Sequence, residues 1–193
     1  MRTSLLLATL LVSALSPMLV QGAESEIKIL SPAEDATKKT VLIGRTAVDG
    51  MSITLEIEGA ESMWMQMGSP PKWMEQPVAK GDIFHLEVKP VDPKSKTRIS
   101  YAEVKFSAMN RDNKKAVSGA MHPSWGDSGL HYASNTPLAG DGSYDVTVTV
   151  GVPSFGRTEN NKDVWTKPVT AKFHFKLAGV KLVEVTKAAA EPK

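Results

Sequence analysis

The 193-residue sequence contains no cysteine. This absence excludes disulfides and lipid attachment through an N-terminal cysteine, so the protein must be stabilised by its core alone. The chain also lacks GxSxG, HExxH, a phosphate-binding loop and GxGxxG, and we therefore expect no enzyme activity. Its 23 basic and 21 acidic residues include no basic block that would favour nucleic acid as a partner.

Only one long apolar run is present, and it lies at the start of the chain. It follows Arg2, extends from Leu5 to Val20 and ends in small residues, which predicts a cleaved secretory signal peptide over residues 1–22. We expect a single domain over residues 23–186, followed by a flexible tail over 187–193. The mature protein should not span a membrane, and it would be periplasmic in a cell with two membranes.

Alternation of apolar and polar residues dominates the rest of the chain. It is clear in residues 51–58, 143–152 and 169–177, and Gly, Pro and Asn turns separate such segments at intervals of roughly ten residues. No amphipathic helix follows the signal. The pattern predicts an all-β fold, an immunoglobulin-like antiparallel β-sandwich of eight or nine strands.

One predicted strand, residues 81–88 with the sequence GDIFHLEV, carries two metal-binding residue types on one face. Phe84, Leu86 and Val88 point one way, whereas His85 and Glu87 point the other. Side chains at i and i+2 lie about 7 Å apart, so one cation could contact both. The alternative is that both are solvated surface positions.

Further candidate ligands lie in a segment that we expect to be an irregular loop, residues 121–138. Met121, His122 and His131 fall within eleven residues there. Together with His85 and Glu87 they would form a mixed set of sulfur, nitrogen and oxygen donors. Such a set suits copper, and with water it could hold ferrous iron or manganese. Structural zinc is a poorer fit, because it favours closed sites of Cys and His.

Two other residues have patterns typical of structural positions. His174 alternates with Lys172 and Lys176, which predicts a solvent-facing side chain. Met51 begins an alternating strand and is by pattern alone a core residue.

Residues 59–80 combine methionine and tryptophan with Gly and Pro, and we expect no long regular element there. Met63, Met65 and Met67 would share a face if the segment were extended, and their soft sulfurs would suit Cu(I). Alternatively, these residues fill an irregular hydrophobic patch or form a partner surface.

Several short motifs, in order, resemble a known family. They are His85-Leu86-Glu87, Gly129-Leu130-His131-Tyr132 with Asn135, Gly140-Asp141-Gly142-Ser143-Tyr144, Gly156-Arg157, Trp165 and Lys167-Pro168. The pattern is similar to the periplasmic iron-uptake protein family over residues 48–177. The resemblance implies a dimeric immunoglobulin-like sandwich that binds copper and assists iron uptake beside an inner-membrane iron permease.

The resemblance also implies a ligand set. The histidine and glutamate of the family's HLE motif match His85 and Glu87, and its second histidine matches His131. A family methionine ligand lies just upstream, where this chain has Met121, and His122 is an alternative at that place. Met51, which follows a glycine as a family methionine does, is an auxiliary candidate. After Gly156-Arg157 the family often has a third histidine, and this chain has Thr158, so we expect its coordination to differ.

Three functional hypotheses follow. The first is a non-enzymatic exported metal-binding protein of an iron-uptake system, whose binding should weaken as the pH falls through about 6, because imidazole must be neutral to coordinate. The second is a copper chaperone or buffer unrelated to iron. The third is a metal-free sandwich that binds a protein partner through residues 64–74.

Overall fold

The structure is a computed structural model that describes residues 26–189. The predicted signal peptide lies outside these residues, as do the last four residues of the predicted tail. Within the described part, the elements are β1 (Ile27–Asp35), β2 (Val41–Val48), β3 (Met51–Gly59), β4 (Met63–Met67), β5 (Lys72–Gln76), β6 (Phe84–Val91), β7 (Val104–Asn110), β8 (Ala116–Gly126), β9 (Gly129–Thr136), β10 (Gly142–Val150), the 3-10 helix η1 (Glu159–Asn161), β11 (Val169–Ala178) and β12 (Lys181–Thr186).

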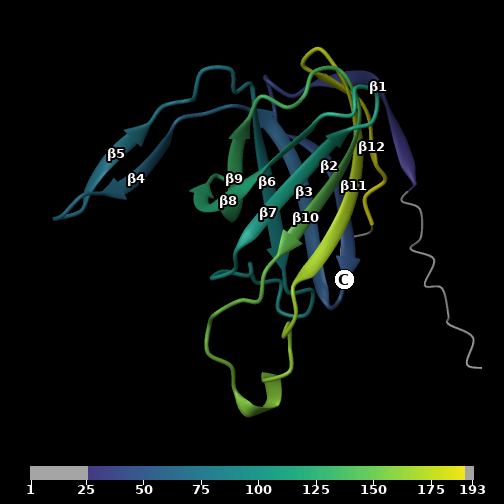
Figure 1. The fold of residues 1–193 in the computed structure, drawn as a ribbon. Coiled ribbons are helices and arrows are strands. Elements are labelled where there is room, and N and C mark those ends of the chain that lie inside the picture. Colours follow the sequence, from purple (N-terminus) through teal and green to yellow (C-terminus); the bar gives the residue numbers. More distant parts are fainter. Residues whose placement is uncertain (1–25, 190–193) are drawn as a thin grey trace, which may run out of the picture.

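Ten of these strands form one continuous antiparallel sheet in the order β1-β12-β11-β10-β7-β8-β9-β6-β3-β2. The sheet folds over so that β2, at one edge, contacts β11 and β12, which gives two packed layers (Figure 1). The long strand β8 belongs to both layers, because its first half pairs with β7 and its second half with β9. The predicted all-β antiparallel sandwich is confirmed. The described residues contain twelve strands instead of eight or nine.

The core lies between the two layers and follows from the alternation in the sequence. Ile53 and Leu55 of β3, together with Val88 of β6, are fully buried and face the opposite layer. Burying such side chains contributes about 1.5–3 kcal/mol each. Tyr144 of β10 stacks on Phe175 of β11, with ring centroids 4.8 Å apart. The core therefore fixes which face of β3 and β6 remains for polar residues.

The segment expected to be an irregular loop after Met121 is instead a hairpin of β8 and β9, with Asp127 and Ser128 at its turn. Pro123 obscured this in the sequence, because proline interrupts most strands. It is tolerated here because this half of β8 pairs on one side only, with β9.

Residues 59–80 contain no long element, as expected, but they are regular over two short strands. They form a second hairpin, β4–β5, which is a separate two-stranded sheet that extends away from the sandwich (Figure 1). The Gly68–Pro71 stretch, which the sequence predicts to interrupt any long regular element, lies at the turn of this hairpin.

The prediction that His174 faces solvent is wrong, because the residue is only 8% exposed. Its strand, β11, lies between β10 and β12, and their side chains cover it. His174 Nδ1 lies 3.4 Å from Asp145, and Nε2 lies 3.7 Å from Glu184. Alternation with lysines identified the polar face correctly but could not reveal these flanking carboxylates.

The first residues of the predicted tail contact the sheet. The Lys187 amide donates to the Glu26 carbonyl at 2.6 Å, and the Ala189 amide donates to the Arg45 carbonyl at 2.8 Å. Among residues 26–189, no helix is long and apolar enough to cross a membrane.

Candidate metal centre

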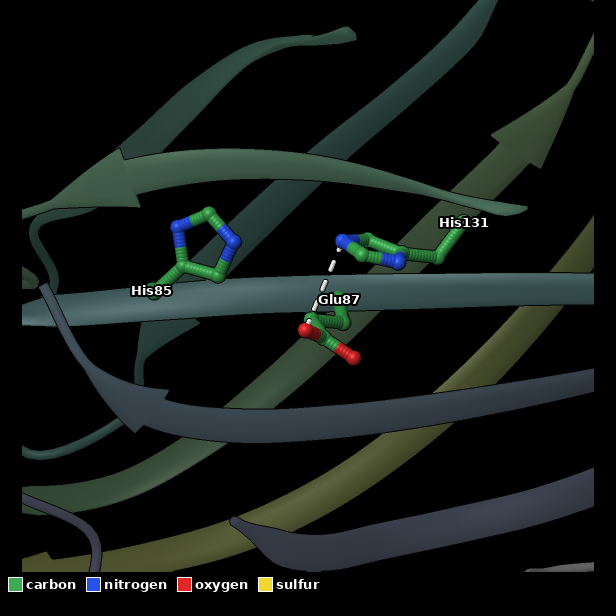
Figure 2. A group of neighbouring side chains, drawn as sticks. All are labelled: His85, Glu87 and His131. Atoms are coloured by element: carbon green, nitrogen blue, oxygen red, sulfur yellow. Dashed lines mark ion pairs between the residues drawn. The ribbon is translucent and has the colours of Figure 1, made fainter. Parts of the chain in front are cut away.

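Two neighbouring strands, β6 and β9, bring the central candidate ligands together. In this register His85 lies opposite Asn135 of β9, and Glu87 lies opposite Ala133. Residues that are opposite each other in an antiparallel pair share a face, and so do residues at i and i+2. His131, two residues before Ala133, therefore joins His85 and Glu87 on the face directed away from the core (Figure 2).

The three side chains form a compact and buried group. Each offers a ligand atom within 4.8 Å of the others, and His131 Nε2 lies 3.4 Å from Glu87 Oε1. The two imidazole rings are 6.4 Å apart and nearly perpendicular. His85, Glu87 and His131 are only 1%, 6% and 2% exposed. They are therefore not the solvated surface residues that the alternative interpretation required.

A hydrogen-bond network fixes which nitrogen of His85 is available. The Asn135 amide nitrogen donates to the Glu61 carbonyl at 2.8 Å, and its Oδ1 accepts from the Glu61 amide at 3.4 Å. Oδ1 can only accept, so the contact at 2.8 Å to His85 Nδ1 requires the proton to be on Nδ1. In the neutral ring, Nε2 then carries a free lone pair.

His131 has the same arrangement. Its Nδ1 lies 2.9 Å from the Gly129 carbonyl oxygen, which can only accept, so Nδ1 is the donor. Among the described residues, Nε2 of His85 and Nε2 of His131 are both buried without a hydrogen-bond partner. Two orphaned imidazole nitrogens that face one carboxylate match the requirements of a metal site, in which the second ring nitrogen is held by an acceptor.

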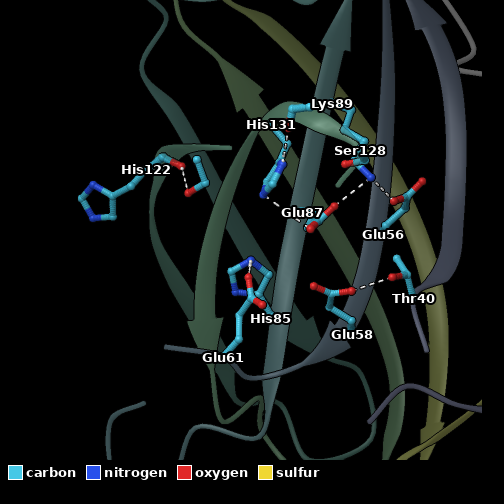
Figure 3. A network of polar contacts seen from close by, with 12 residues as sticks. Thr40, Glu56, Glu58, Glu61, His85, Glu87, Lys89, His122, Ser128 and His131 are labelled. Carbon is cyan, nitrogen blue, oxygen red and sulfur yellow. Dashed lines mark hydrogen bonds and ion pairs between the residues drawn. The ribbon is translucent and has the colours of Figure 1, made fainter. Parts of the chain in front are cut away.

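A buried lysine orients the carboxylate. Lys89 Nζ lies 2.7 Å from Glu87 Oε2 and also bonds Glu56, which leaves Glu87 Oε1 to face His131 (Figure 3). Burial alone would lower the pKa of Lys89, but its hydrogen bonds to Glu56 and Glu87 and their charges outweigh burial and raise it. Lys89 is therefore a buried cation positioned between the two carboxylates.

A second group of possible ligands adjoins the first and shares His85. It consists of Glu58, Glu61 and His85, with ligand atoms again within 4.8 Å of one another. Glu61 Oε1 is 3.7 Å from His85 Nε2, and its side chain is about half exposed, at 52%. This group therefore connects the buried centre with solvent.

The other three predicted ligands lie elsewhere. Met121 and Met51 are buried members of the hydrophobic core. Met51 has the parity of Ile53 and Leu55, so it lies on the opposite face of β3 from Glu56 and Glu58. His122 is exposed, and Figure 3 shows its side chain pointing away from the group. The structure thus brings together His85, Glu87 and His131 but not Met51, Met121 or His122.

Thr158, the residue found where the family often has a third histidine, lies outside the group as well. Thr158 precedes η1, and its hydroxyl accepts a hydrogen bond of 2.9 Å from the Asn161 side chain. In the described residues its hydrogen bonds are local to that loop.

Sequence reasoning missed the supporting residues Lys89, Glu56 and Asn135. Lys89 continues the alternation of His85 and Glu87, and Glu56 alternates on its own strand, so parity could have placed each on a polar face. Nothing in the sequence gives the strand register that joins the two strands. Asn135 was noted as part of a motif, but its contact with His85 depends on the pairing of β6 with β9.

Comparisons with known proteins agree with this fold. The UPF0423 protein of Brucella abortus (strain 2308) is 30% identical over 166 residues, which cover 78% of this chain and 88% of that protein. A copper-bound variant of Campylobacter jejuni P19 has a TM-score of 0.58 at 21% identity and covers 72% of this chain and 98% of its own. A copper-bound variant of FetP from uropathogenic E. coli has a TM-score of 0.58 at 22% identity and covers 73% of this chain and 94% of its own.

The two structural likenesses concern the fold. The family assignment rests on the sequence, which matches the family described as Fe2+ transport protein over residues 39–179, most of the described chain. The chain therefore belongs to the Fe2+ transport protein family.

Proposed function

We propose that the protein is an exported, periplasmic metal-binding component of an iron-uptake system that binds copper through His85, Glu87 and His131. One observation carries the proposal: two buried imidazole nitrogens without hydrogen-bond partners converge on a carboxylate. A buried polar atom without a partner is costly, by about 1–3 kcal/mol, and a bound metal would satisfy both atoms at once.

The donor set favours copper. Imidazole nitrogen suits Cu(II), which binds most tightly among the divalent first-row metals. The copper-bound P19 and FetP structures share the fold, which supports the same metal here. The three side chains leave coordination positions open for water or a further ligand. No residue of the site has the arrangement of a nucleophile and base, so we propose binding, not catalysis.

The cellular setting rests on the family. Membership in the Fe2+ transport protein family supports a role beside an inner-membrane iron permease and its accessory proteins. One of the similar FetP structures comes from protein expressed in the periplasm, which supports the proposed location. We also keep the homodimer expected from the resemblance as part of this proposal.

Ferrous iron or manganese is a second candidate, and one observation favours it. The adjoining carboxylates of Glu58 and Glu61 share His85 with the centre. Carboxylate oxygens suit harder divalent ions better than copper. A metal held between Glu58, Glu61 and His85 would lie at the exposed side of the buried centre.

The test is a parallel titration of the exported protein with Cu(II) and Mn(II), using His85→Ala and His131→Ala. Loss of Cu(II) binding in both variants would show that β6 and β9 build one site. His122→Ala is the matched control, because this histidine is exposed and lies outside the group, and it should bind normally. Unchanged Cu(II) affinity in His85→Ala and His131→Ala would refute the proposal.

A growth experiment separates iron uptake from copper buffering. A strain without the protein should grow poorly when iron is scarce. Normal growth under iron starvation, together with sensitivity to copper, would favour a copper chaperone or buffer instead.

A further inference from the structure

The β4–β5 hairpin has two faces of different chemistry. Its register places Met65 directly opposite Met74, and Met63 and Met67 lie two residues to either side of Met65. Because opposite and i, i+2 positions share a face, four methionines lie on one side of the hairpin. We call Met63, Met65, Met67 and Met74 the methionine face. The opposite side carries Trp64, Gln66, Trp73 and Glu75.

These methionines do not fill the protein core. Met65, Met67 and Met74 are 42%, 44% and 49% exposed. The hairpin forms its own sheet and extends away from the sandwich (Figure 1). By contrast, Met51 and Met121 are buried in the core. Packing within the chain therefore explains two methionines of the protein but not the methionine face.

The thioethers are close enough to act together. Opposite residues in an antiparallel pair have Cβ atoms about 4.5–5.5 Å apart, and neighbours on one strand lie about 7 Å apart. Methionine side chains are long and flexible enough to close these gaps. The Met67 sulfur already extends along the face, because it lies 3.1 Å from Nε2 of Gln76, the residue opposite Met63 at the far end of the hairpin.

The chemistry of this face selects for a soft cation. Thioether sulfur is a soft, neutral ligand that suits Cu(I). Besides the methionines, the face carries Gln76 and Lys72 and no carboxylate, since Glu75 is on the other side. Iron(II) and manganese(II), which prefer oxygen ligands, have no carboxylate to bind on this face.

We propose that the methionine face is a Cu(I)-binding site, separate from the centre formed by His85, Glu87 and His131. This site uses none of those three residues, so the proposal can be tested independently of the function proposed above. The base of the β4–β5 hairpin is nevertheless connected to that centre by hydrogen bonds. Asn135, which holds His85, also bonds both backbone groups of Glu61, two residues before Met63.

The first test is an anaerobic Cu(I) titration of the exported protein, with bathocuproine disulfonate as the competing chelator. In the double variant Met65→Leu and Met74→Leu, leucine keeps the apolar volume and removes the sulfur. We expect Cu(I) affinity to fall by at least about tenfold. Met109→Leu is the matched control, since Met109 is 41% exposed on β7, and it should bind as the unmodified protein does.

The variants of the other centre keep the two sites distinguishable. His85→Ala with His131→Ala should lose Cu(II) binding and retain Cu(I) at the methionine face. The proposal is overturned if the leucine double variant binds Cu(I) normally, or if Met109→Leu weakens binding equally.

A second readout does not depend on affinity. With methyl-labelled methionine and Ag(I) as a redox-inert probe, the NMR signals of Met63, Met65, Met67 and Met74 should shift. Those of the buried Met51 and Met121 should stay in place. A spectrum in which Ag(I) moves none of the four hairpin signals would overturn the proposal and leave the hairpin as a surface for a protein partner.

Discussion

Asn135→Ala tests whether the metal centre depends on a residue that would not itself touch the metal. Asn135 Oδ1 accepts a hydrogen bond of 2.8 Å from His85 Nδ1–H. This bond fixes the ring with Nε2 facing Glu87 and His131. Loss of such an outer partner typically lowers metal affinity about 10–100-fold. That range corresponds to about 1.4–2.8 kcal/mol of binding free energy. We therefore expect Asn135→Ala to bind Cu(II) about 10–100-fold more weakly than the unmodified protein does.

The same change should destabilise the protein without metal. It leaves the buried His85 Nδ1–H without an acceptor, which costs about 1–3 kcal/mol. It also removes the side-chain hydrogen bonds to the Glu61 backbone. Urea unfolding in the presence of a chelator measures this loss, and chelator competition measures Cu(II) affinity.

Two further variants separate positioning from general damage. Asn135→Asp retains an acceptor for Nδ1 and, being charged, makes the imidazole a stronger ligand, so its affinity should equal or exceed that of the unmodified protein. Asn113→Ala removes an exposed asparagine whose amide donates to Ala139, a contact outside the metal group, and should leave Cu(II) affinity unchanged. The reasoning fails if Asn135→Ala binds Cu(II) normally, or if Asn135→Asp loses as much affinity as Asn135→Ala.

Three other variants test further parts of the structure. Glu87→Gln removes the carboxylate charge between the two imidazoles and should weaken Cu(II) binding in chelator competition, whereas an equal affinity would exclude Glu87 as a ligand. Lys89→Met removes the buried cation that bonds Glu56 and Glu87. The change should lower the free energy of unfolding by about 3–5 kcal/mol, and bound metal should restore part of this loss. Because the folded state raises the pKa of Lys89, its contribution is complete below about pH 10.4, the ordinary lysine value, and is lost as the pH rises through the raised pKa. The stability difference between the unmodified protein and Lys89→Met, measured by urea unfolding from pH 8 upward to about 11.5, should therefore shrink at the alkaline end, and a constant difference would contradict the ion-pair argument. Tyr144→Phe leaves the Ala139 amide, which donates to the tyrosine oxygen at 2.8 Å, without its acceptor and should cost about 1–3 kcal/mol with no change in Cu(II) affinity.

The alternation of residues predicted much of the fold and two of the three converging ligands. It identified the core strands around Ile53 and Val146, and it placed His85 and Glu87 on one face of a strand. Both results depend only on local geometry, because side chains on a strand alternate whatever the strand packs against.

The remaining site residues required strand register, which is a nonlocal property. Whether His131 meets Glu87 depends on how β9 aligns with β6, and a shift by one residue would turn its side chain to the other face. The same rule explains why Met121 is in the core although it precedes His122. Proximity in the sequence made it a candidate ligand, but in a strand neighbouring residues point in opposite directions.

Burial was the other property that the sequence did not give. His85, Glu87 and His174 have the spacing of exposed polar residues, yet flanking strands cover all three. A polar residue on a central strand is enclosed by side chains from both neighbours, and the sequence does not say which strands are central.

The sequence by itself determined that this protein is an all-β sandwich in which a histidine and a glutamate share one strand face, because strand periodicity is a local physical rule. The clustering of Met121, His122 and His131 made the second histidine a candidate, and the family resemblance carried by the motifs supported it. Only the tertiary structure decided that three of the six candidate ligands converge. Buried nitrogens without partners, a lysine that holds Glu87, and four methionines on a projecting hairpin are all consequences of pairing between distant segments, which local sequence does not encode.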